Sequence, residues 1–222
     1  MADIINLLPE TVSNQIAAGE VVKRPSSVLK ELVENALDAG ATVIKIGIVD
    51  AGKSLVQVID NGKGMSIKDA HLCFERHATS KIKDAQDLFN LYTMGFRGEA
   101  LASIAAVAQV DLRTRRAEDE LGFHLVIEGG KIILEEPYAM TPGSTFTVKN
   151  LFFNIPVRRR FLKRDQTEMR NIITEFQNIA LIRPDIEFRL SSNQDVVYDL
   201  LASGFKQRIK SVMGKNMVSI TF

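Results

Sequence analysis

The sequence has little cysteine, no tryptophan and no long apolar run. The single cysteine, Cys73, excludes a disulfide framework and a metal site built of cysteines, and it fits a reducing cytoplasm. The longest charge-free stretch of small apolar residues, 100–110, is too short to span a bilayer. The N-terminal segment carries Asp3 and Glu10 and lacks the basic region that begins a signal peptide. We therefore expect a cytoplasmic protein with neither secretion nor a membrane span.

An excess of charge of one sign is absent as well. Lys and Arg number 28 against 27 Asp and Glu, a formal net charge of +1, which excludes a globally basic protein. At 222 residues with 45% apolar composition, the chain is long enough to bury a full core. This size suits one domain of about 200 residues plus a remnant.

Alternation and breaker residues predict an α+β fold. We expect a two-layer α/β sandwich whose mixed, mainly antiparallel sheet is covered by helices on one face. Residues 1–22 show no strong periodicity and are expected to form an arm, with the main domain at 23–200. Pro25 and Gly40 mark the start and the C-cap of a helix. Further helices are expected at 66–75, 98–106 and 165–182, and strands at 42–50, 54–60, 108–115, 121–128, 131–136, 144–149 and 186–191.

Within the first predicted helix, Glu31 and Asn35 lie one turn apart. At about 100° per residue, Asn35 and Asp38 fall within roughly 40° of Glu31, on the side opposite the apolar positions. A carboxylate can accept a proton from water, and an amide oxygen is a hard ligand suited to Mg²⁺. This face could hold a water and a metal-bound phosphate together. The same spacing is also common on solvated helix faces, which is the alternative interpretation.

A polar turn, Asp60-Asn61-Gly62-Lys63-Gly64, follows the apolar run 55–59. Glycines let a backbone approach a flat ligand or adopt positive φ, and the neighbouring aspartate can accept a hydrogen bond from an exocyclic amine. Taken alone, the stretch is also that of an ordinary hairpin turn.

A glycine-rich stretch at 95–101, with the sequence GFRGEAL, leads into an apolar run that ends at residue 107. Such a stretch resembles a loop that delivers free backbone N–H groups at a helix N-terminus, where phosphate oxygens bind well. The alternative is a simple helix-capping sequence. The polar helix face, the polar turn and this stretch rarely coincide in this order by chance.

These patterns resemble a known family. The spacings Glu31-x-x-x-Asn35 and Asp60-x-Gly62-x-Gly64, the 95–101 stretch and the 143–145 sequence GST look like the four ATP-site motifs of the superfamily that groups DNA gyrase B, Hsp90, histidine kinases and MutL. The longer strings QIAAGEVV at 15–22, HATSK at 77–81 and GFRGEAL resemble the MutL group of mismatch-repair ATPases in particular. The resemblance runs from about residue 4 to about residue 200.

The resemblance implies a Bergerat-type ATP-binding fold and Mg²⁺-dependent ATP hydrolysis that drives conformational switching in DNA mismatch repair. It implies Glu31 as the general base, Asn35 as the Mg²⁺ ligand and Asp60 as the acceptor from the adenine amine. The other nucleotide-binding residues that it implies are Asp38, Gly62, Gly64, Lys81, Gly95, Phe96, Arg97, Gly98, Glu99, Ala100, Leu101 and Thr145.

Residues 76–98 are polar with little periodicity, and a stretch of that length is usually functional or disordered. The resemblance implies a mobile ATP lid, in which Lys81 approaches the phosphates. Without the resemblance, Lys81 is equally well a surface lysine.

A basic segment is the other non-random feature. Residues 149–170 hold seven Lys or Arg and two acids, a local charge of +5 on a chain of net +1. Such a cluster could neutralise DNA phosphates and make binding salt-dependent, or it could be a solvated basic helix start. The resemblance favours DNA contact by Arg158, Arg159, Arg160, Lys163 and Arg164.

The resemblance also implies partners: DNA, a mismatch-recognition protein of the MutS type, downstream repair enzymes and, in the full-length protein, a second copy of the chain. Family members continue into a second domain that supplies a lysine to the γ-phosphate and much of the dimer interface. Residues 201–222 are therefore expected to begin that domain, and the ATPase of this chain to be weak.

Two other functions stay open at this point. A different enzyme of the superfamily, such as a topoisomerase or kinase subunit, is disfavoured by the longer strings, and a DNA-cleavage or phosphotransfer assay separates it. A non-catalytic, nucleotide-sensing DNA scaffold would use the same pocket, and single-turnover hydrolysis distinguishes it from an ATPase.

Overall fold

The structure, a computed structural model, describes residues 6–79 and 98–214. The described chain contains these elements in order: α1 (Glu10–Val21), α2 (Pro25–Asp38), β1 (Val43–Val49), the 3₁₀ turn η1 (Asp50–Gly52), β2 (Leu55–Asp60), α3 (Ile67–Leu72), α4 (Ala100–Val107), β3 (Gln109–Arg115), β4 (Gly122–Glu128), β5 (Lys131–Tyr138), β6 (Gly143–Lys149), α5 (Pro156–Phe161), α6 (Asp165–Ile182), β7 (Glu187–Ser192), β8 (Asp195–Leu200) and α7 (Phe205–Met213).

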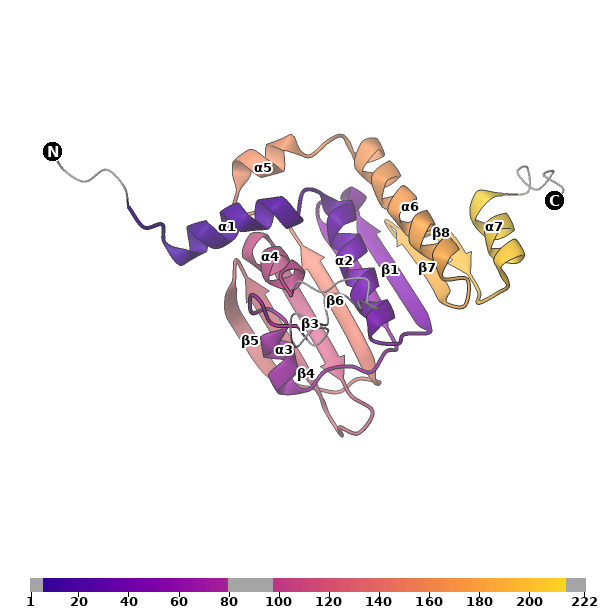
Figure 1. Ribbon diagram of the computed structural model, residues 1–222, viewed down its shortest axis with the longest axis horizontal. Coiled ribbons are helices and arrows are strands. Elements are labelled where there is room, and N and C mark those ends of the chain that lie inside the picture. The colour runs from indigo at the N-terminus through magenta and orange to yellow at the C-terminus, as the bar shows by residue number, and fades with distance from the viewer. Residues whose placement is uncertain (1–5, 80–97, 215–222) are drawn as a thin grey trace, which may run out of the picture.

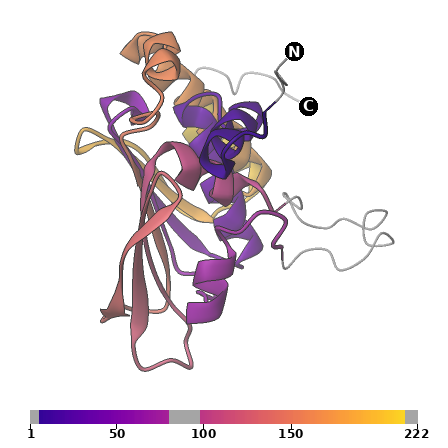
Figure 2. The same ribbon diagram turned by 90° about the vertical axis from the view of Figure 1, so that its left-hand side faces the viewer.

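The strands of the described chain form one eight-stranded sheet in the order β5-β4-β3-β6-β2-β1-β7-β8. Neighbours are antiparallel except β1 and β7, which are parallel. The helices cover one face of the sheet and leave the other open (Figures 1 and 2). The predicted α+β class, with a mixed, mainly antiparallel sheet, is confirmed.

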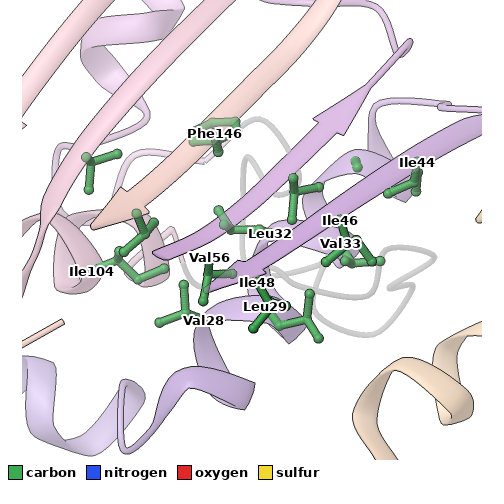
Figure 3. Close-up of a cluster of buried hydrophobic side chains, with 14 of the residues drawn as sticks. Val28, Leu29, Leu32, Val33, Ile44, Ile46, Ile48, Val56, Ile104 and Phe146 are labelled. Atoms are coloured by element: carbon green, nitrogen blue, oxygen red, sulfur yellow. The ribbon is translucent and has the colours of Figure 1, made fainter. Parts of the chain in front are cut away.

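The core lies between α2 and the centre of the sheet (Figure 3). Alternation explains it: Ile44, Ile46 and Ile48 of β1 are at most 1% exposed and point to the helices, while the residues between them face the open side. Leu29 and Leu32 of α2 meet them and are equally buried. Each such side chain contributes about 1.5–3 kcal/mol by leaving water, which fixes α2 on the sheet.

Helix α2 has the predicted limits to within a residue. Pro25 occupies its first turn, where the missing N–H is not needed. Gly40 follows its C-terminus with φ +75°, a left-handed conformation that glycine adopts without strain.

The N-terminal arm is more ordered than the sequence suggests. Glu10–Val21 forms α1, which packs beside α4. Its apolar residues do not form a continuous stripe, because Val12 and Ile16 are exposed whereas Ala18 is buried. Weak amphipathicity therefore concealed this helix.

The C-terminal elements β8 and α7 were also not expected. In α7, Arg208 is fully buried, and its Nη2 donates to the carbonyl oxygens of Pro184 (3.0 Å), Ile186 (2.6 Å) and Leu201 (3.0 Å). Arg208 therefore connects α7 to the segment before β7 and to the residue that follows β8. The predicted boundaries at residues 22 and 200 stay predictions.

Candidate active site

The polar face of α2 forms one wall of the candidate site. Glu31, Asn35 and Asp38 are each half-buried, whereas Leu32 and Val33 on the opposite side are 1% exposed. The structure thus brings the three polar residues to one side of the helix, as the spacing predicts. The positions of these three side chains are set by the packing of α2 on the sheet, not by a loop.

Asp60 lies at the end of β2 and is 8% exposed. Its Oδ1 accepts a hydrogen bond from the backbone N–H of Gly62 at 2.8 Å. Burial, the largest effect, raises the pKa of Asp60 to about 6, although the backbone N–H groups of Gly62 and Ser144 act in the opposite direction. A carboxylate buried to this degree can accept a hydrogen bond from a ligand N–H group with little competition from bulk water.

The turn after Asp60 is fixed to α2. The backbone N–H of Lys63 donates to the carbonyl oxygen of Ala39 at 3.0 Å. Gly64 has φ +67°, and a Cβ there would overlap the backbone of Arg115 at the end of β3. The turn therefore passes where a larger residue does not fit, and it holds Asp60 in a constant position relative to the polar face of α2.

Three polar residues form a row across neighbouring strands. Asp60 pairs with Ser144 of β6, and Ser144 pairs with Thr114 of β3. Directly opposed residues share a face, so all three lie on the helix-covered side. The Oγ1 of Thr114 lies 3.0 Å from the Oγ of Ser144 and accepts from the backbone N–H of Met65 at 2.9 Å. Sequence reasoning missed Ser144 and Thr114, although the alternation along β6 could have indicated Ser144.

The prediction for Thr145 does not fit this geometry. Thr145 is paired with Ile59 on one side and Arg113 on the other, one position away from the Asp60 row. Its side chain therefore lies on the open face of the sheet, because successive strand residues point to opposite faces. Ser144, not Thr145, is the hydroxyl residue of this motif that shares a face with Asp60.

The candidate phosphate-binding segment is described in part. Gly98 has φ +61°, and a Cβ there would overlap the backbone of Ala78. Glu99 precedes α4 and pairs with His77 at 3.4 Å between Oε1 and Nδ1. Ala100 and Leu101 begin α4, whose first N–H groups have no acceptor within the helix. Four predicted residues of this part of the site lie outside the described residues: Lys81, Gly95, Phe96 and Arg97.

The basic segment lies at α5 and the start of α6, at the top of the view in Figure 1. Of the five residues predicted to contact DNA, Arg159, Arg160, Lys163 and Arg164 are exposed. Arg158 differs from the prediction. It is half-buried, and its Nη2 is directed to the carbonyl oxygen of Ile16 in α1, 3.4 Å away.

A known family matches the part of the chain that carries these elements. Residues 23–139, more than half of the chain, match the family of histidine kinase-, DNA gyrase B- and HSP90-like ATPases. The chain belongs to this ATPase family. The match includes the polar face of α2, the Asp60 turn and the start of α4.

Relatives place the chain within the family. It is 60% identical to the DNA mismatch repair protein MutL of Phocaeicola vulgatus over 98% of its own length and 35% of that protein. It spans about a third of the length of such relatives. The solved Aquifex aeolicus MutL ATPase domain complexed with ADP is 35% identical, with a TM-score of 0.73, over 87% of this chain and 70% of that one. The N-terminal domain of a DNA repair protein gives a TM-score of 0.77 at 28% identity, over 91% of this chain and 60% of that one. The chain is thus an ATPase domain of the MutL group.

The described residues offer few side-chain ligands for a metal ion. Within residues 6–79 and 98–214, no three His, Cys, Asp or Glu side chains gather as a metal site. His71 and His77 instead pair with separate carboxylates, those of Glu135 and Glu99. An Mg²⁺ ion commonly takes one or two protein oxygens and completes its shell with phosphate and water, which the single amide of Asn35 suits.

Among the described helices, none combines the length and apolarity needed to cross a bilayer.

Proposed function

We propose that this chain is the nucleotide-binding and hydrolysing region of a MutL protein in DNA mismatch repair, and that hydrolysis drives conformational switching. The observation that carries the proposal is the fixed relation between two walls: the Asp60 row and the polar face of α2, joined by the hydrogen bond from Lys63 to Ala39. Asp60, the proposed adenine acceptor, and Glu31, the proposed general base, are thereby held on elements that share one core.

Asp60 is assigned to the adenine ring. Its carboxylate would accept a hydrogen bond from the exocyclic amine, which Gly62 and Gly64 allow to approach. The buried position strengthens that bond, because no water competes for the carboxylate. Ser144 and Thr114 complete the polar row on which the base edge would rest. The ADP in the related Aquifex aeolicus structure supports nucleotide binding here.

Glu31 is assigned as the general base. It would accept a proton from the attacking water, a role that typically contributes about 10²- to 10⁴-fold in rate. Asn35, one turn further along α2, would bind Mg²⁺, and Asp38 would extend the same polar wall. The metal, when bound, neutralises phosphate charge, and the protein supplies position and electrostatic support.

The start of α4 is assigned to the phosphates. The backbone N–H groups at Gly98, Glu99, Ala100 and Leu101 would face phosphate oxygens, which helix N-termini bind well. Gly95, Phe96, Arg97 and Lys81 belong to the same proposal, as the part of the site that lies outside the described residues.

The wider role involves macromolecules. Exposed Arg159, Arg160, Lys163 and Arg164 would contact DNA phosphates, and the MutL relatives support a place beside a MutS-type protein and downstream repair enzymes. In the full-length protein, a homodimer is expected, and the cytoplasm is the expected compartment. The chain, about a third of its relatives' length, would be a weak ATPase alone.

Single-turnover hydrolysis of labelled ATP tests the proposal. With enzyme in excess, the wild-type chain should release phosphate, the Glu31→Ala variant should bind ATP but release almost none, and Lys68→Ala on exposed α3 should match the wild type. Binding without hydrolysis by the wild-type chain would instead favour a nucleotide-sensing scaffold. If no nucleotide binds, the assignment of the Asp60 row fails.

A further inference from the structure

Arg158 is set apart from its basic neighbours. Arg159 and Arg160 in the same short helix are exposed, but the guanidinium of Arg158 turns inward. Its Cζ lies 6.0 Å from the centre of the Phe152 ring, and its Nη1 is buried without a hydrogen-bond partner among the described residues. A guanidinium in this position is not presented to the phosphates of a DNA backbone.

Helix α1 has a glycine where this guanidinium lies. A Cβ on Gly19 would overlap the Nη2 and Cζ of Arg158. Nη2 also donates to the carbonyl oxygen of Ile16 at 3.4 Å, in the same turn of α1. A helix with an interior glycine is less stable than the same helix with alanine, so Gly19 makes α1 less stable than an alanine would. The space that Gly19 leaves is the space that Arg158 fills.

The segment before α5 is fastened at a second place, the end of α4. The backbone N–H of Phe152 donates to the carbonyl oxygen of Val107 at 2.8 Å, and the Nδ2 of Asn154 donates to that of Ala106 at 2.9 Å. Phe152 is 1% exposed and has φ +61°, an uncommon conformation for a large residue. Phe152, whose ring lies near the guanidinium of Arg158, is therefore fixed to α4, the helix that begins at the candidate phosphate site.

We propose that Arg158 is a positioning residue that latches α1 to α5 through Gly19, and that it is not a DNA contact. The latch joins α1 to the short helix that carries Arg159 and Arg160, the residues assigned to DNA under the proposed function. The DNA part rests on the proposed function, whereas the contact between Arg158 and Gly19 does not.

A double-mutant cycle on thermal unfolding tests the latch in the 222-residue chain. In the Arg158→Ala background the space is open, and Gly19→Ala should raise Tm by about 2–4 °C as a helix glycine is removed. In the wild-type background, the added methyl group displaces the guanidinium from its contact with Ile16, so Gly19→Ala should raise Tm by a smaller amount or lower it. A smaller or reversed shift in the wild-type background supports the latch, and equal shifts in both backgrounds would overturn it.

A salt titration of binding to a short labelled DNA duplex separates the latch from a phosphate contact. Arg159→Ala should reduce the slope of log K against log salt by about 0.9, the value for one phosphate contact. Arg158→Ala should leave the slope unchanged and instead speed amide hydrogen exchange in α1, which Arg159→Ala should not do. A reduced slope for Arg158→Ala with unchanged exchange would overturn the assignment. If the wild-type chain binds no DNA, the DNA proposal fails, and the thermal cycle still decides on the latch.

Discussion

Asp60 offers the sharpest test of the site, since the same burial that suits adenine recognition costs stability. Its pKa, 3.8 in an exposed aspartate, is raised to about 6 in the folded chain. The folded state thus holds the proton more tightly than the unfolded state, so this contribution to stability is complete below pH 4 and is lost as pH rises through 6. At about 1.4 kcal/mol per pKa unit, the loss amounts to roughly 3 kcal/mol.

Asp60→Asn keeps the shape and removes the charge. The amide oxygen can still accept from Gly62, so at pH 8 the variant should be more stable than the wild type by about 1–3 kcal/mol, once its weaker hydrogen bonds are allowed for. Such a gain raises Tm by roughly 3–10 °C in a domain of this size. The gain should shrink toward pH 4, where the wild-type carboxyl is protonated. ATP affinity should meanwhile fall by about 1.5–3 kcal/mol, roughly 10- to 150-fold.

Thermal unfolding without nucleotide between pH 4 and pH 8 measures the first effect, and equilibrium dialysis with ATP measures the second. Asp195→Asn, at an exposed position on β8, is the matched control and should change neither. If Asp60→Asn has the wild-type Tm at pH 8, the carboxyl group carries no burial penalty and the reasoning is refuted. If it keeps the wild-type ATP affinity, Asp60 is only a turn residue.

Three further outcomes are expected. Glu31→Ala should retain ATP binding and lose about 10²- to 10⁴-fold in turnover, measured in a chain that includes the next domain, and unchanged turnover would remove its role as base. The double change Arg159→Glu, Arg160→Glu should weaken DNA binding and flatten its salt dependence, whereas an unaltered slope would return α5 to a solvated basic face. Residues 1–222 should be mostly monomeric by light scattering with or without an ATP analogue, because a small arm contact does not offset the cost of association. A stable, fully active dimer would show that the dimer contact lies within these residues.

The sequence predicted what depends on local spacing. The α2 face followed from 3.6-residue periodicity, and the central strands from the alternation of Ile44, Ile46 and Ile48. The sequence did not predict helix α1, because this helix is held by small residues and by Arg158 rather than by an apolar stripe. The charge run at 158–164 likewise could not show which arginine turns inward, since that depends on Gly19, 139 positions earlier in the chain.

The placement of Thr145 on the face opposite to Asp60 has a general cause. A motif gives residue types in order, but the side of a sheet on which each lies depends on strand register, and a shift of one residue exchanges the faces. Here the register is set by the core: Phe146 and Val148 are 5% and 2% exposed and must face the helices, so Ser144 faces the same way. Asp60 obeys the same rule through Val56 and Val58, each 1% exposed. Asp60 and Ser144 are 84 positions apart in the chain, yet they are paired in the sheet. The apolar residues of their two strands thus decide which hydroxyl stands beside the Asp60 carboxylate.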